Sequence, residues 1–150
     1  MNRLNHNTRV LVTDGGRAQV FRNVGQVGKP DLRSVKNYDN DTPPTRELGT
    51  DKPPRVNSLG GDRSSIDATD YHQQAEDRFI QQMAADMDAD LKAGEFTELV
   101  VVAPPVALGV YRKAASLQLQ KATLQEINKD LTKHSAADVA AIVVKALEGD

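Results

Sequence analysis

The sequence contains no cysteine, and it has no long apolar run. Without cysteine it can form neither a disulfide framework nor a thiolate-based metal or redox site. The absence of cysteine also fits a reducing compartment. No apolar run approaches the roughly 18 residues that a membrane-spanning helix needs. The first nine residues are too polar for a signal peptide. We therefore expect a cytoplasmic protein without a membrane partner.

Neither sign of charge dominates, since 19 Lys and Arg stand against 21 Asp and Glu. A chain that is not basic overall can contact nucleic acid only through a local patch. The length of 150 residues and the hydrophobic content of 39% are ordinary for one globular domain. We expect residues 1–150 to form that single domain.

Hydrophobic periodicity predicts five strands and three helices. The strands are expected at residues 9–13, 17–22, 31–38, 99–103 and 123–127. The helices are expected at 71–93, where apolar side chains recur every four residues before Gly94 stops the helix, at 106–119, and after Ser135, a favourable N-cap.

This order, β-β-β-α-β-α-β-α, predicts an α/β fold with a mixed five-stranded sheet of ribonuclease H-like topology. In that topology the first and fourth strands are parallel neighbours, and the fifth strand lies outside the fourth. Asp14 and the turn at Pro104 then share the carboxyl edge of the sheet, where open α/β sheets bind ligands.

A long polar insert, residues 39–70, precedes the first helix and breaks this periodicity. Its prolines and glycines are Pro43, Pro44, Gly49, Pro53, Pro54, Gly60 and Gly61. Structureless stretches of this length are uncommon and tend to be either functional or disordered. The sequence does not settle which of the two applies, so partial disorder stays open.

The insert carries four basic residues, Arg46, Lys52, Arg55 and Arg63, interspersed with acids. Arginine forks suit phosphate or carboxylate groups. Internal salt bridges with the neighbouring acids are the alternative, and the near-equal charge count favours them.

Catalytic patterns are weak in this sequence. A two-metal nuclease of this topology needs several carboxylates, and the expected strand 99–103 contains none. The histidines, at 6, 72 and 134, lack ligand spacing, and no nucleophile elbow occurs. Asp14 before two glycines is either ordinary turn chemistry or a functional carboxylate. We predict no catalytic residue, metal or cofactor, and the residues favour a non-catalytic protein.

Five segments, in order along the chain, resemble motifs of the bacterial host attachment protein family. They are residues 12–18 (VTDGGRA), 46–55 (RELGTDKPPR), 101–105 (VVAPP), 108–109 (LG) and 129–132 (KDLT). The chain departs from the family at Pro54, where glycine is usual, and at Ser64, where histidine is usual. Any role that needs an imidazole at Ser64 is therefore not implied.

That family is similar in fold to the middle domain of archaeal and eukaryotic peptide-chain release factors. The release-factor domain is ribonuclease H-like and carries a Gly-Gly-Gln loop into the ribosome. The comparable insert here has Gly60-Gly61-Asp62, and aspartate cannot supply the neutral amide of glutamine. The resemblance therefore implies recognition rather than peptidyl-tRNA hydrolysis.

Three functions follow as hypotheses. The first is a non-catalytic module that binds the ribosome, RNA or another phosphate-bearing partner. Its anion-binding residues would be Asp14, Arg17, Arg46, Lys52, Arg55 and Arg63. The second is a protein interaction or assembly factor whose Pro-rich insert docks on a partner. The third is a hydrolase of a phosphorylated or RNA substrate, centred on Asp14, Arg17 and Arg55.

Overall fold

The computed structural model describes residues 3–39 and 61–149, with the backbone alone for residues 61–70. The described elements are β1 (Arg9–Thr13), β2 (Arg17–Asn23), β3 (Leu32–Asp39), α3 (Gly61–Lys92), β4 (Leu99–Val102), α4 (Pro105–Ala114), α5 (Leu117–Ala122), β5 (Thr123–Ile127) and α6 (Ala136–Glu148). Residues 40–60 of the predicted insert lie outside this description.

The five strands form one mixed sheet in the order β3-β2-β1-β4-β5. β1, β2 and β3 are antiparallel neighbours, whereas β4 runs parallel to β1 and β5 parallel to β4. This is the α/β sheet predicted from the order of the elements, with the first and fourth strands side by side. The expected ribonuclease H-like arrangement of the strands is therefore confirmed.

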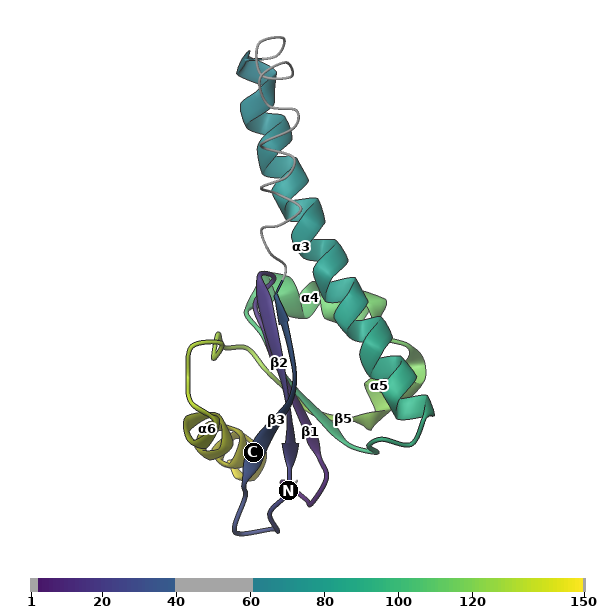
Figure 1. Ribbon diagram of the computed structural model, residues 1–150, viewed down its shortest axis with the longest axis vertical. Coiled ribbons are helices and arrows are strands. Elements are labelled where there is room, and N and C mark those ends of the chain that lie inside the picture. The colour runs from purple at the N-terminus through teal and green to yellow at the C-terminus, as the bar shows by residue number, and fades with distance from the viewer. Residues whose placement is uncertain (1–2, 40–60, 150) are drawn as a thin grey trace.

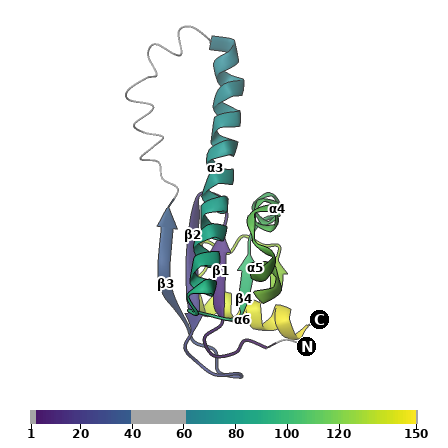
Figure 2. The same cartoon turned by 90° about the vertical axis from the view of Figure 1, so that its right-hand side faces the viewer.

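Helices cover both faces of the sheet (Figures 1 and 2). On one face, side chains such as Leu11 and Val101 pack against α3, α4 and α5, and on the other Val10 and Val100 pack against α6. The alternation follows from the twofold side-chain period of a strand. β1 and β4 are buried on both faces, which accounts for their continuous apolar sequences.

Helix α3 begins at Gly61, not at residue 71 as the periodicity predicted. The segment 61–70 has almost no apolar residues, so it carries no stripe from which a helix could be recognised. The last ten residues of the predicted insert are therefore helical. At its other end Gly94, at φ 80°, stops the helix as expected.

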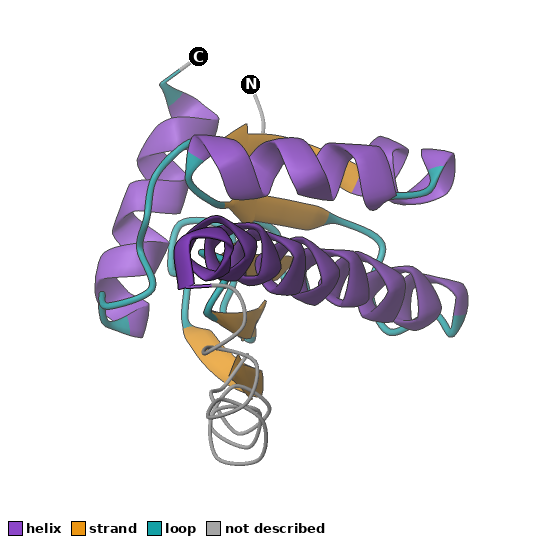
Figure 3. Ribbon diagram, turned by 90° about the horizontal axis from the view of Figure 1, so that it is seen from above, coloured by secondary structure: helices purple, strands orange, loops and turns teal. Residues whose placement is uncertain are grey.

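The expected helix 106–119 is divided into α4 and α5, so this prediction was wrong in its continuity. The division falls at Ala115 and Ser116, both of which have extended backbones. The Ser116 side chain accepts the Leu119 backbone N–H and so caps α5. α3 and α4 run alongside each other over the sheet (Figure 3).

Candidate functional site

The turn between β1 and β2 lies at the carboxyl end of β1. Asp14 Oδ1 accepts the backbone N–H groups of Gly16 and Arg17, at 2.8 Å and 3.0 Å. Gly15 has φ 104°, a backbone conformation that glycine adopts without steric cost. Asp14 therefore has the structural role in the turn that the sequence offered as one of two alternatives.

The second oxygen of Asp14 connects the turn to the loop after β5. The Thr132 hydroxyl lies 3.3 Å from Asp14 Oδ2 and 2.7 Å from Asp130 Oδ1. The Thr132 backbone N–H also donates to Asp130 Oδ1, at 3.1 Å. Hydrogen bonds from the Thr132 side chain and then from its backbone lower the pKa of Asp130, and Lys133 and His134 add to the effect.

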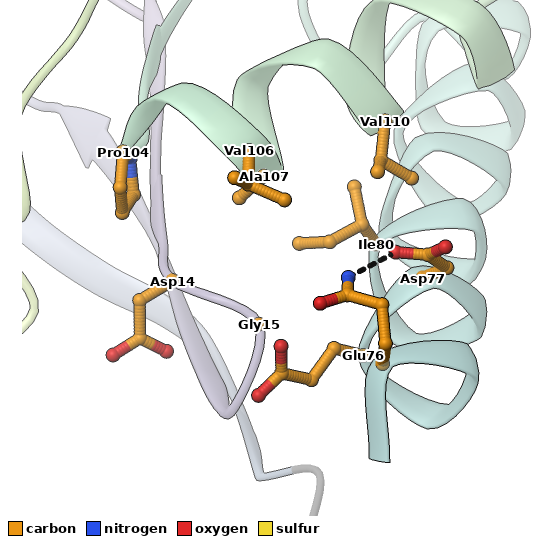
Figure 4. Close-up of a pocket in the computed structure, with 10 residues that line it drawn as sticks. Asp14, Gly15, Glu76, Asp77, Ile80, Pro104, Val106, Ala107 and Val110 are labelled. Carbon is orange, nitrogen blue, oxygen red and sulfur yellow. Dashed lines mark hydrogen bonds between the residues drawn. The ribbon is translucent and has the colours of Figure 1, made fainter. Parts of the chain in front are cut away.

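A cavity of about 200 Å³ lies between this turn, α3 and the start of α4 (Figure 4). Its lining includes both Asp14 and Pro104, so the prediction that these residues meet at one edge of the sheet is confirmed. The carboxylates of the lining are Asp14, Glu76 and Asp77, and its apolar wall is formed by Ile80, Pro104, Val106, Ala107 and Val110.

The charge of this cavity is acidic. No lysine or arginine stands in the lining that the described residues provide, and Asp77 accepts a hydrogen bond from Gln73 Nε2 at 2.8 Å. Glu76 packs close to the turn, since a Cβ on Gly15 would lie 3.4 Å from Glu76 Cδ. Three carboxylates repel a phosphate group, so the cavity is unsuited to an anionic ligand.

Metal binding has no support in the part of the chain that the structure describes. No group of three or more His, Asp or Glu side chains is arranged there to hold a metal ion. Within the same ranges, no helix has the length and apolar content to cross a membrane.

Arg17 follows Asp14 by three residues in the turn, but it lines a different cavity. This second cavity, of about 320 Å³, is bordered by Arg17, Tyr38, Asp39 and Thr132. Arg17 and Asp39 are also paired in the β2–β3 register. Arg17 is exposed, and it stands where the chain leaves β3 toward residues 40–60.

The other predicted site residues cannot be placed relative to this edge. Arg46, Lys52 and Arg55 lie outside the described residues, and Arg63 belongs to the first turn of α3 with an undescribed side chain. The hydrogen bond between Thr132 and Asp14 was not predicted from the sequence. The two residues are 118 positions apart, and a threonine in a loop carries no pattern that indicates so distant a contact.

Comparison with known proteins gives a family match over most of the chain. A family model described as bacterial archaeo-eukaryotic release factor family 12 matches residues 7–143. Among solved structures, the crystal structure of an archaeal translation termination factor, aRF1, is similar at 12% sequence identity and a TM-score of 0.46. That alignment covers 95% of this chain but only 39% of the archaeal factor. No curated protein matches the sequence.

Proposed function

The chain belongs to bacterial archaeo-eukaryotic release factor family 12, and on this premise we propose that it is a non-catalytic, cytoplasmic binding module of translation. In this proposal the ribosome or RNA is the partner, and phosphate groups are bound by the basic residues Arg46, Lys52, Arg55 and Arg63. The resemblance to host attachment proteins stays a prediction.

The observation that carries the proposal is the shape of α3. The helix runs from Gly61 to Lys92, and a helix of 32 residues is about 48 Å long. Among its described side chains, which begin at residue 71, the first fully buried one is Ile80, and residues 71–74 are all exposed. Figure 1 shows the N-terminal half of α3 extending beyond the sheet and the other helices.

This extension places the backbone of Arg63 away from the acidic cavity. Residues 61–74 alone add about 20 Å beyond the first partly buried turn. Arg46, Lys52 and Arg55 lie outside the described residues. A projecting helix with an arginine in its first turn suits contact with a phosphate backbone inside a large particle.

The non-catalytic part of the proposal rests on two observations. The insert has Gly60-Gly61-Asp62 and no Gly-Gly-Gln, so the amide associated with peptide release is not supplied there. The cavity at the carboxyl edge offers carboxylates and an apolar wall, and the lining that the described residues provide contains no Ser, Thr, His or Lys side chain.

Co-sedimentation with ribosomes over a salt series tests the proposal. Phosphate contacts release counterions, so pelleting of the wild type should fall steeply as salt rises. A variant with R46Q, K52Q, R55Q and R63Q should pellet less. The slope of the logarithm of its binding constant against the logarithm of the salt concentration should be shallower by about one for each lost phosphate contact.

The matched control removes four exposed lysines elsewhere, with K113Q, K121Q, K129Q and K145Q. Both variants carry the same net charge, so only a local role of the insert separates them. Equal loss in both variants would mean that the insert has no special role. No pelleting of the wild type at low salt would reject the ribosome as partner.

A protein partner is the second candidate, and the apolar wall of the acidic cavity favours it. Val106 in that wall is 66% exposed, and exposed apolar side chains beside a cavity are common at protein interaction sites. A pull-down with the full chain and with a chain lacking residues 43–59 separates the two candidates. Capture that survives the deletion favours a folded surface over the insert.

A further inference from the structure

Three arginines stand in one cross-strand row at the end of the sheet away from Asp14. Arg9 on β1 is paired with Arg22 on β2, and Arg22 is paired in turn with Arg33 on β3. Like charges directly opposite each other destabilise a sheet. The outermost arginine is neutralised, because Asp31 binds Arg33 through two hydrogen bonds of 2.9 Å and 3.0 Å. Among the described residues, no carboxylate binds either of the inner two in this bidentate way.

Arg9 and Arg22 are held side by side by one neutral group. Asn7 Oδ1 accepts hydrogen bonds from Arg9 Nη1 at 3.0 Å and from Arg22 Nε at 2.8 Å. Asn7 has a left-handed backbone, with φ 72°, a conformation that is uncommon outside glycine and costs energy. The Arg9 guanidinium also lies 5.8 Å from the centre of the Phe96 ring. The two cations are therefore positioned rather than free to swing apart.

Their charge is only partly compensated inside the protein. Arg9 is 8% exposed, and its closest carboxylate, Glu95, lies 3.8 Å away on a side chain that is 57% exposed. Burial and the nearby Arg22 lower the pKa of Arg9. Asp90 is engaged by Lys36 Nζ at 2.9 Å. Among the described residues, no carboxylate forms an ion pair with Arg22.

A cavity of about 380 Å³ opens on these groups. Its lining comprises Arg9, Arg22, Val35, Lys36, Asp90 and Glu95, so three cations face two carboxylates. Arg9 is paired with Glu95, whereas the half-buried Arg22 has no ion pair among the described residues, and guanidinium groups bind oxyanions through paired hydrogen bonds. The cations come from three neighbouring strands, an arrangement that suits a tetrahedral phosphate better than a planar carboxylate.

We propose that this cavity is a phosphate-binding site. In this site Arg9 and Arg22 donate hydrogen bonds to the phosphate oxygens, and Lys36 contributes a further positive charge. The site is separate from the α3 extension and does not depend on the function proposed for it. The phosphate could belong to a small phosphorylated molecule or to an RNA backbone, and the experiment distinguishes these sources.

Calorimetric titration of the full chain with inorganic phosphate, at constant ionic strength, is the test. Arg22→Gln should weaken binding by about tenfold or more, since it removes a charge-assisted hydrogen bond. Glu95→Gln should tighten binding by about two- to fivefold, because it removes the competing carboxylate. The side chains of Arg22 and Glu95 are both at least partly exposed, so neither substitution creates a cavity in the hydrophobic core.

Two control variants carry the same charge changes at residues that do not line the cavity. They are Arg112→Gln on α4 and Glu148→Gln at the end of α6, and both should leave the affinity for phosphate unchanged. The site is supported if Arg22→Gln lowers the affinity for phosphate, Glu95→Gln raises it, and neither control variant changes it. Absence of saturable phosphate binding, equal effects in the controls, or equal affinity for acetate would each overturn it.

Competition then identifies the source of the phosphate. If a short single-stranded RNA displaces inorganic phosphate, and Arg22→Gln weakens the RNA as well, the site binds a nucleic-acid backbone. If RNA leaves phosphate in place, the site binds a small phosphorylated molecule. Either result is compatible with failure of the ribosome co-sedimentation experiment, so the two proposals can fail independently.

Discussion

Asp88 on α3 binds Ser116 at the break between α4 and α5. Asp88 Oδ2 accepts the Ser116 backbone N–H at 3.3 Å, and Asp88 Oδ1 accepts the Ser116 hydroxyl proton. Ser116 Oγ in turn accepts the Leu119 backbone N–H at 3.0 Å. One carboxylate therefore fixes the end of α4, the cap of α5 and the position of both against α3.

Asp88→Ala should lower the free energy of unfolding by about 1–3 kcal/mol, because it leaves a partly buried hydroxyl and N–H without their acceptor. Urea denaturation measures the change. Asp77→Ala is the control on the same helix, since it removes only a hydrogen bond from Gln73 four residues earlier. Its expected cost is about 0.2–0.5 kcal/mol. Equal costs for the two variants would contradict the role assigned to Asp88.

Tyr111→Phe should leave stability unchanged or raise it slightly. Tyr111 is 1% exposed, and within the described residues its hydroxyl has no hydrogen-bond partner. Burial raises the pKa of Tyr111 to about 12, although the nearby Thr123 side chain acts in the opposite direction. A buried hydroxyl without a partner carries a desolvation cost, which phenylalanine does not. A melting temperature several degrees below that of the wild type would show that the hydroxyl is bonded in solution.

Asp130 should make stability depend on pH in the acid range. The pKa of Asp130 is lowered in the folded chain, chiefly by the Thr132 hydroxyl. A lowered pKa contributes stability that is complete above the ordinary Asp value of about 3.9 and is lost as pH falls through the folded value. The urea midpoint of the wild type should therefore fall more steeply below about pH 4 than that of Asp130→Asn.

Thr132→Val is the companion change, since it removes the hydroxyl and keeps the backbone N–H. It should reduce the difference between wild type and Asp130→Asn in the same acid range. If all three proteins lose stability in parallel as pH falls, the hydrogen bond between Thr132 and Asp130 does not control this titration.

Local patterns were sufficient to predict most of the fold. Continuous apolar residues identified β1 and β4, and Ser135 was recognised as an N-cap; its side chain accepts the Asp138 backbone N–H. The topology rule then placed Asp14 beside Pro104. These inferences worked because each depends on neighbours in sequence or on one general rule of sheet connection.

Other parts depend on contacts that no local pattern encodes. The break at Ser116 is fixed by a carboxylate 28 residues earlier. The arginine row exists only in the observed register, which shifts between Val20 and Phe21. The acidic cavity needs the rotation of α3 that turns Glu76 toward the β1–β2 turn (Figure 4). The start of α3 at Gly61 was missed because residues 61–70 are almost without apolar side chains, so they leave no periodic signal in the sequence.

Gln74→Pro tests whether the α3 extension must be helical to act. Proline in a helix interior removes a backbone hydrogen bond and clashes with the preceding turn. Gln74 is exposed and lies ahead of Ile80, the first fully buried residue among the described side chains of α3, so the damage should stay local. The far-UV circular dichroism of helices should weaken, while the urea midpoint stays near that of Gln74→Ala, the matched control.

Ribosome pelleting at low salt should then fall for Gln74→Pro and not for Gln74→Ala. The basic residues are unchanged in both variants, so their charge alone cannot produce this difference. A rigid helix holds its tip at one distance from the sheet, whereas a broken one lets the tip sample many positions and raises the entropy lost on binding. Equal pelleting of the two variants would mean that the insert binds as a flexible basic segment, for which α3 is only an attachment point.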